Sequence, residues 1–171
     1  MEVFACKSLV SGENPVDGRQ RPGQACGLAL SPVPGNRMNI LQLQTALTDY
    51  FAPWIQALGL EVTAGDMNQV TLRLPLSEQL ARTGGMVCGQ AMMAAADTAM
   101  ALAIFSHFGQ FRPCTTVQMS SSFLKPLSGQ DGLVEARLLR VGKSLAFGEI
   151  DIRSAADGKS VYRASATYAL L

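Results

Sequence analysis

The segment 86–105 constrains the fold more than any other part of this 171-residue chain. It is rich in Ala and Met and carries one charge, that of Asp97. A carboxylate halfway along a membrane span is costly, and the flanking segments alternate polar and apolar residues as strands do. The pattern therefore predicts a buried core helix from about Gly89 to Phe108, and no membrane-spanning segment.

The rest of the chain favours strands. After the long helix we expect an antiparallel meander of four strands at 115–123, 132–139, 145–152 and 160–170, and before it two strands at 60–63 and 70–74. Apolar residues at helical spacing predict a helix over 40–58, which Pro53 should kink or split. This order predicts an α+β fold, with a curved antiparallel sheet wrapped around one long central helix and an extra N-terminal helix.

Residues 1–37 differ from the rest because Gly and Pro recur there without periodicity. We expect a disordered or loosely attached leader, followed by one domain over 38–171. A helical pattern starts directly after Met38, which suggests the hypothesis that Met38 is the biological start. The first ten residues contain no secretory signal pattern, so we expect a cytoplasmic protein.

Charge and cysteine content exclude several classes of partner. The net charge is +1, and residues 38–171 hold ten basic and ten acidic side chains, so we expect neither nucleic acid nor a membrane as a partner. The four cysteines form no CxxC pair and the chain has one histidine, so we expect no bound metal.

Two residues of the long helix carry chemistry. Gly89 is expected at the helix start, where free backbone N–H groups and the helix dipole stabilise a developing negative charge. Asp97 is a lone carboxylate among Ala and Met, and burying such a charge is costly unless it is paired or functional. Eight residues separate the two, roughly 12 Å along a helix. Both can reach one substrate carbon only if two antiparallel copies share the site, which predicts an obligate homodimer.

The segment Val87-Cys88-Gly89-Gln90 followed by Asp97 resembles the V-H-G-G pattern of the hotdog-fold acyl-CoA thioesterases of the phenylacetate-degradation (PaaI-type) group. Residues 122–127 look like that group's strand ending F-L-[RK]-P, and residues 139–147 are similar to its hairpin with G-[RK]. The resemblance covers residues 55–171 and implies a hotdog fold. It also implies an acyl-CoA substrate, a homodimer or homotetramer, and no cofactor, because coenzyme A is part of the substrate.

The resemblance also assigns roles by position. Asp97 takes the place of the base or nucleophile, Gly89 that of the oxyanion donor, and Thr116 falls near a Ser/Thr that assists the attacking water. Cys88 stands where the group has His, Gln90 replaces its second Gly, and Arg82 stands where relatives often have Asn, which makes all three candidate substrate contacts. Two more candidates, for the CoA phosphates, are Arg140 and Lys143 at the end of the hairpin.

These residues predict a hydrolase for the thioester of an acyl- or aryl-CoA. Either Asp97 acts as a general base for a water molecule that attacks the thioester, or Asp97 attacks the thioester itself. The altered Cys88 and Gln90 leave open a second class, a non-catalytic acyl-CoA-binding hotdog dimer. Cys88 itself is either a small packing residue or a nucleophile activated by the helix start. A hotdog dehydratase is disfavoured, because it needs a His with an acidic partner and the one histidine, His107, falls at the far end of the helix.

Overall fold

The computed structural model describes residues 37–171. The predicted leader, residues 1–37, lies outside the described residues except for Arg37. The predicted helix start after Met38 is present: helix α1 spans Ile40–Asp49, and Asn39 and Gln42 cap it reciprocally through side-chain and backbone hydrogen bonds of 2.8 Å. Helix α2 spans Pro53–Gln56. Pro53 splits the predicted helix because a proline lacks the N–H that a helix interior needs, whereas the first position of a new helix does not need it.

Six antiparallel strands form one sheet in the order β1-β2-β6-β7-β8-β5. The strands are β1 (Glu61–Gly65), β2 (Gln69–Leu74), β5 (Cys114–Phe123), β6 (Gly132–Val141), β7 (Leu145–Ser154) and β8 (Ser160–Leu170). All six predicted strands are present. The predicted meander is wrong at one point, because β5 pairs with β8 at the sheet edge and β6 pairs with β2. Polar and apolar alternation marks a strand without naming its neighbour, so the sequence could not reveal this crossover.

The segment before the long helix holds three short elements that the sequence analysis missed. A 3₁₀ turn spans Glu78–Leu80, and a two-stranded ribbon pairs β3, Ala81–Arg82, with β4, Met86–Val87. The backbone N–H of Val87 also donates to the Leu127 carbonyl at 2.9 Å. The ribbon and this bond hold the chain just before the helix start.

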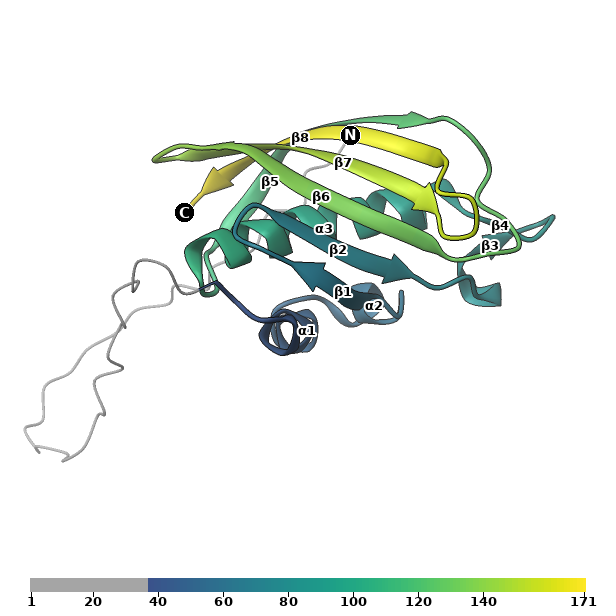
Figure 1. The fold of residues 1–171 in the computed structure, drawn as a ribbon, viewed down its shortest axis with the longest axis horizontal. Coiled ribbons are helices and arrows are strands. Elements are labelled where there is room, and N and C mark those ends of the chain that lie inside the picture. Colours follow the sequence, from purple (N-terminus) through teal and green to yellow (C-terminus); the bar gives the residue numbers. More distant parts are fainter. Residues whose placement is uncertain (1–36) are drawn as a thin grey trace, which may run out of the picture. The chain divides into compact units, whose positions relative to one another are not determined.

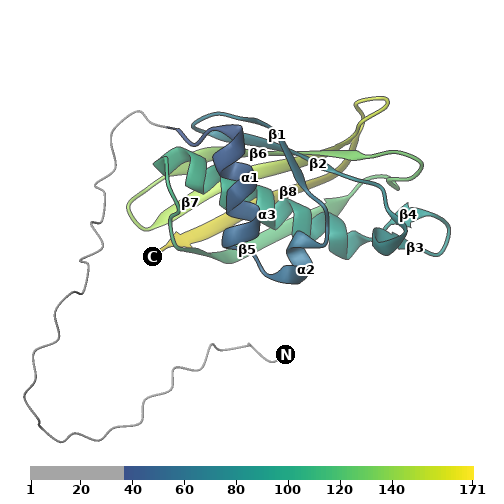
Figure 2. The ribbon, with the colours of Figure 1, turned by 90° about the horizontal axis from the view of Figure 1, so that it is seen from below.

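Helix α3 spans Gly89–Phe108, the bounds expected from the sequence, and ends at Gly109 in the left-handed conformation. The sheet curves over α3 (Figure 1). Helices α1 and α2 also pack against α3 (Figure 2). A Cβ on Gly148 of β7 would lie 2.8 Å from the Arg137 carbonyl oxygen and closer still to the Met100 side chain, so only glycine fits between the sheet and α3 here. A curved antiparallel sheet around one long helix is the predicted hotdog arrangement.

Helix α3 is long and apolar enough to cross a membrane by composition alone. In its most apolar 18-residue window, 78% of the residues are buried inside the protein. The prediction of a core helix is therefore confirmed.

Candidate active site

The Asp97 carboxylate is half-buried and receives two hydroxyl hydrogen bonds. The Thr116 hydroxyl donates to Asp97 Oδ1 at 2.8 Å. The Tyr168 hydroxyl contacts the same Oδ1, and lies 2.9 Å from the Asp97 backbone carbonyl oxygen. No residue in the described part of the chain donates a hydrogen bond to Oδ2. The arrangement leaves Oδ2 free to accept a proton or to attack an electrophile.

Sheet register explains why the two hydroxyls meet. Thr116 of β5 and Tyr168 of β8 are direct cross-strand partners, so their side chains leave the same face of the sheet. A register shift follows at once, because Gln118 pairs with the next β8 residue, Thr167, and Val117 is left over. Such a bulge reverses which residues of β5 face the helix on either side of it.

Burial and charge keep Tyr168 in its protonated form. Tyr168 is 2% exposed, and burial followed by the negative charge of Asp97 holds the pKa of its phenol well above the usual value. The same two causes raise the pKa of the Cys114 thiol, which also lies near Asp97, to about 11. Around neutral pH, Tyr168 is therefore a hydrogen-bond donor and Cys114 is a neutral thiol.

The start of α3 offers unused backbone donors. Cys88 is the N-cap, its side chain makes no capping hydrogen bond, and the N–H of Gly89 has no acceptor within residues 37–171. A Cβ on Gly89 would lie 3.1 Å from the Phe123 ring, so an aromatic face borders this helix end. The free N–H and the helix dipole together form a site for a developing anion.

Gly89 and Asp97 line two different cavities within one chain. The Gly89 cavity has a volume of about 480 Å³ and is bordered by the predicted contacts Arg82 and Gln90, with Phe123 and Lys125. The Asp97 cavity has a volume of about 370 Å³, and its wall includes Thr116, Cys114 and Tyr168 together with aromatic side chains, namely Tyr50, Phe51, Phe105 and Phe111. The two cavities have no lining residue in common.

The remaining predicted residues are placed as follows. Cys88 is half-buried and lies next to the Gly89 cavity without lining it. Arg140 and Lys143 are exposed at the β6–β7 turn, away from Gly89 and Gln90. That turn is tied to the end of β8 by a hydrogen bond from the Leu170 N–H to the Ser144 carbonyl, 2.9 Å long. The turn therefore lies at the end of the sheet where Leu171 borders the Asp97 cavity.

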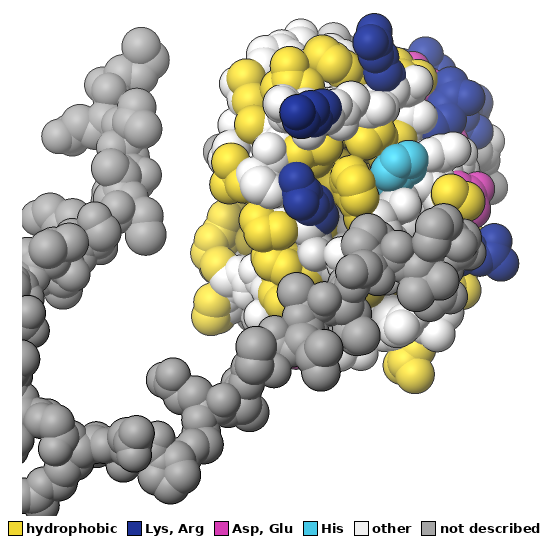
Figure 3. All heavy atoms as spheres, turned by 90° about the vertical axis from the view of Figure 1, so that its left-hand side faces the viewer, with side chains coloured by type: hydrophobic (Ala, Val, Ile, Leu, Met, Phe, Trp, Pro, Cys, Tyr) yellow, Lys and Arg dark blue, Asp and Glu magenta, His cyan; other side chains and the backbone are white. Residues whose placement is uncertain are grey.

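At this end of the domain, Lys and Arg side chains lie among hydrophobic ones (Figure 3). None of the ion pairs found among residues 37–171 involves Arg112, Arg140 or Lys143. Unpaired cations at the edge of an apolar surface can bind a ligand that has both a negatively charged part and an apolar part.

Tyr168 and Phe123, which lie against the two candidate groups, could not be identified as site residues from the sequence. Both occupy positions that alternation predicts to be ordinary strand residues. The signal that was available for Tyr168 is chemical: a phenol hydroxyl buried in a core needs a hydrogen-bond partner. The sequence did not reveal which partner it has, because Asp97 lies 71 residues earlier.

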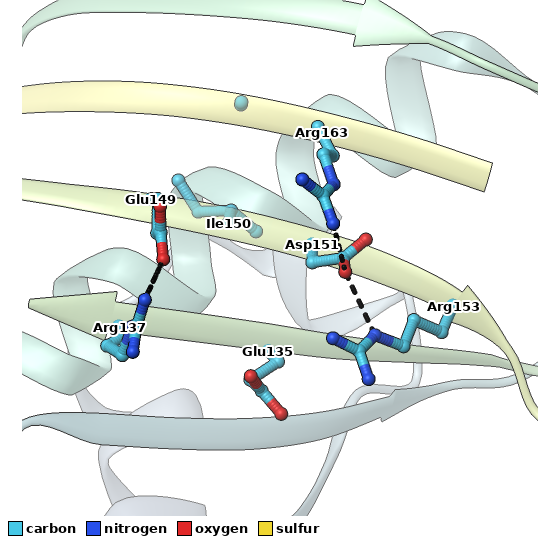
Figure 4. Close-up of a pocket in the computed structure, with 8 residues that line it drawn as sticks. Glu135, Arg137, Glu149, Ile150, Asp151, Arg153 and Arg163 are labelled. Carbon is cyan, nitrogen blue, oxygen red and sulfur yellow. Dashed lines mark hydrogen bonds and ion pairs between the residues drawn. The ribbon is translucent and has the colours of Figure 1, made fainter. Parts of the chain in front are cut away.

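A third cavity, of about 370 Å³, lies on the sheet face opposite α3 and carries charges of both signs (Figure 4). Asp151 pairs with Arg153 at 2.9 Å and with Arg163 at 3.6 Å, and Arg137 pairs with Glu149. These side chains largely neutralise one another, because three arginines lie beside three carboxylates in the cavity wall. Residues 37–171 also contain no cluster of three His, Cys, Asp or Glu side chains that could hold a metal ion.

Comparisons with known proteins agree with this fold. The family model of the Thioesterase superfamily matches residues 84–161. A solved structure of a proposed thioesterase from Silicibacter sp. TM1040 is 31% identical, covers 78% of this chain and 92% of its own, and has a TM-score of 0.70. Zebra fish thioesterase superfamily member 2 has the same fold, with a TM-score of 0.70 at 22% identity over 78% of this chain and 99% of that one.

A proposed esterase of Thermoplasma acidophilum is 25% identical over 97 residues, which cover 57% of this chain and 73% of that protein. The matched residues 84–161 contain α3 with Asp97, strand β5 with Thr116, and strands β6 and β7 of the sheet. On these grounds the chain belongs to the thioesterase superfamily.

Proposed function

We propose that this protein hydrolyses the thioester of an acyl- or aryl-CoA, with Asp97 as its central catalytic residue. The observation that carries the proposal is the Asp97 carboxylate, which is half-buried on a cavity wall with one oxygen held by two hydroxyls and the other free. A polar arrangement of this kind inside an apolar core is costly for folding and is typical of functional sites.

The chemistry follows from the free oxygen. Oδ2 of Asp97 takes a proton from a water molecule as the water attacks the thioester carbonyl, and the carbonyl oxygen becomes an anion. The Gly89 N–H stabilises that anion, and the tetrahedral intermediate then expels the CoA thiolate. In the alternative route Oδ2 attacks the carbonyl directly, and water hydrolyses the resulting anhydride. Hydrolysis of one bound substrate in H₂¹⁸O detects the direct route when water opens the anhydride at Cγ of Asp97, because the product acid then keeps the unlabelled Oδ2 and the ¹⁸O stays on Asp97.

We infer that two copies of the chain form each site. Gly89 and Asp97 lie on separate cavities and roughly 12 Å apart along α3, a gap that one thioester cannot span. An antiparallel copy of α3 places the Gly89 of one chain opposite the Asp97 of the other, so the working unit is a homodimer or a dimer of dimers. A stable, active monomer in light scattering would contradict this arrangement.

The basic residues supply the proposed contacts to coenzyme A. Arg140 and Lys143 are exposed cations near the Asp97 cavity, and Arg82 lines the Gly89 cavity. Cys88 and Gln90 border the Gly89 end, where the thioester would lie. Both residues depart from the V-H-G-G pattern, and this departure is the observation that favours the second candidate function, a non-catalytic acyl-CoA-binding dimer.

The test measures hydrolysis and binding of a panel of acyl-CoA esters by the wild-type protein and by Asp97→Asn. Replacing the anion with an amide keeps the size and should lower kcat by roughly 10²- to 10⁴-fold, with little change in substrate affinity. The thermal midpoint of unfolding controls for stability. A folded variant with near-normal turnover would contradict the mechanism, and tight binding by the wild type without hydrolysis would favour the binding module.

A further inference from the structure

The Tyr168 hydroxyl lies where it can fix both the side chain and the backbone of Asp97. It contacts Oδ1 of the carboxylate and lies 2.9 Å from the carbonyl oxygen of the same residue. The Thr116 hydroxyl reaches the same Oδ1 from the neighbouring strand at 2.8 Å. Two donors on one oxygen hold the plane of the carboxylate and leave the other oxygen uncommitted.

Thr116 and Tyr168 are not equivalent. Thr116 is exposed on the edge strand β5, whereas Tyr168 is 2% exposed and belongs to β8, which has a neighbour on each side. A hydrogen bond to a charged group is stronger than one between neutral groups, and it gains strength where water is excluded. Tyr168 is therefore the more rigid of the two anchors.

The other titratable groups around Asp97 do not compete for this role. Burial raises the pKa of both Cys114 of β5 and Tyr162 of β8, and the negative charge of Asp97 adds to the rise in each case. Arg112, which precedes β5, lies near Cys114, and Tyr50 lines the same cavity from the end of α1. Among residues 37–171, only Thr116 and Tyr168 donate a hydrogen bond to the Asp97 carboxylate.

We propose that Tyr168 is a positioning residue for the hydrolysis: its hydroxyl holds Asp97 as an oriented carboxylate with Oδ2 aimed at the reacting water or thioester. This role rests on the proposed function of Asp97. Tyr168 need not touch the substrate, and it remains protonated throughout the reaction. Its contribution is expressed in kcat, because the orientation of Asp97 matters in the transition state more than in substrate binding.

The chain offers a matched control for the test. Tyr162 lies six residues earlier on β8, faces the same side of the sheet and is fully buried, but its hydroxyl shares a hydrogen bond with Ser121 at 2.7 Å and does not contact Asp97. Tyr162→Phe and Tyr168→Phe each remove one buried hydroxyl from the same strand. Any loss of stability should therefore be similar, and the difference in kinetics isolates the contact with Asp97.

For Tyr168→Phe we expect kcat to fall about tenfold or more while KM changes by less than about twofold, since a hydrogen bond to a charged group is lost. Tyr162→Phe should change neither kcat nor KM. Equal kinetics for the two folded variants would overturn the proposal.

A second measurement does not depend on activity. The chain has three tyrosines, so ¹³Cζ-tyrosine NMR of the full chain gives a simple spectrum. Asp97→Asn should shift the Tyr168 resonance, which loses a charged acceptor, more than that of Tyr162. A larger shift at Tyr168 supports the contact even if the wild type hydrolyses no CoA ester, in which case only the proposed function fails. An unshifted Tyr168 resonance would overturn the inference.

Discussion

The oxyanion role of Gly89 can be tested by removing a single hydrogen-bond donor. Proline lacks the backbone N–H, and Gly89 is the first residue of α3, the one helical position where proline is favourable. The residue before a proline must be extended, and Cys88 already has φ −69° and ψ 149°. No acceptor within residues 37–171 receives the Gly89 N–H, so Gly89→Pro breaks no hydrogen bond in that part of the protein.

Gly89→Ala is the control for the extra carbon atoms. A Cβ at this position would lie 3.1 Å from the Phe123 ring, a contact that alanine and proline share. Phe123 is 51% exposed, so its ring can move slightly to accommodate the new carbon. Alanine keeps the N–H and proline removes it, while proline at a compatible site changes stability by only about 1 kcal/mol or less. The comparison between the two variants therefore measures the N–H itself.

Loss of one oxyanion donor lowers kcat by roughly 10²- to 10³-fold in enzymes that stabilise a tetrahedral intermediate. We expect that loss for Gly89→Pro relative to Gly89→Ala, with both variants folded and a KM within a few-fold of each other. The assay is steady-state hydrolysis of an acyl-CoA that the wild type accepts, with circular dichroism and the thermal midpoint as controls. Equal kcat values for the two variants would refute the assignment of the oxyanion site to Gly89.

Two further predictions concern packing and thiol chemistry. Gly148→Ala should lower the free energy of unfolding by about 1–3 kcal/mol, because the new Cβ meets both the Met100 side chain and a rigid backbone carbonyl. An unchanged midpoint in urea unfolding would contradict the close packing of α3 on β7. Cys114 should react slowly with iodoacetamide at pH 8, since a thiol with a pKa of about 11 is roughly one part in 10³ thiolate there. Peptide mass spectrometry measures that rate, and alkylation of Cys114 as fast as that of a free thiol would contradict a buried neutral group.

The parts of the fold that depend on local pattern could be predicted from the sequence. Helix α3 and strand β8 have the expected bounds, because helical and strand periodicities are set by near neighbours along the chain. The site residues Thr116 and Asp97 were expected to act together, and their side chains meet at 2.8 Å. Their catalytic roles stay predictions.

What the sequence did not reveal depends on distant pairing. Strand β5 follows α3 in the chain, yet it lies beside β8 at the far edge of the sheet. That placement brings Tyr168 to Asp97, and no local rule links residues so far apart in sequence. The bulge at Val117 could not be predicted either. An extra residue shows in a sequence only as a break in the alternation of polar and apolar residues, and most residues of β5 are polar, so no such break is visible.

The bulge gives strand β5 a place at both ends of the proposed shared site. Thr116 meets Asp97 before the bulge, and Phe123 borders Gly89 at the end of the strand, so both face α3 although seven positions separate them. Without the extra residue at Val117, strict alternation would put these two side chains on opposite faces of the sheet. Strand β5 is an edge of the sheet and is free to pair with a second copy. An antiparallel pairing of two β5 strands about their middle places the Thr116 end of one chain beside the Phe123 end of the other. The same twofold axis would then unite the Asp97 cavity of one chain with the Gly89 cavity of its partner, which is the arrangement that the separation along α3 requires.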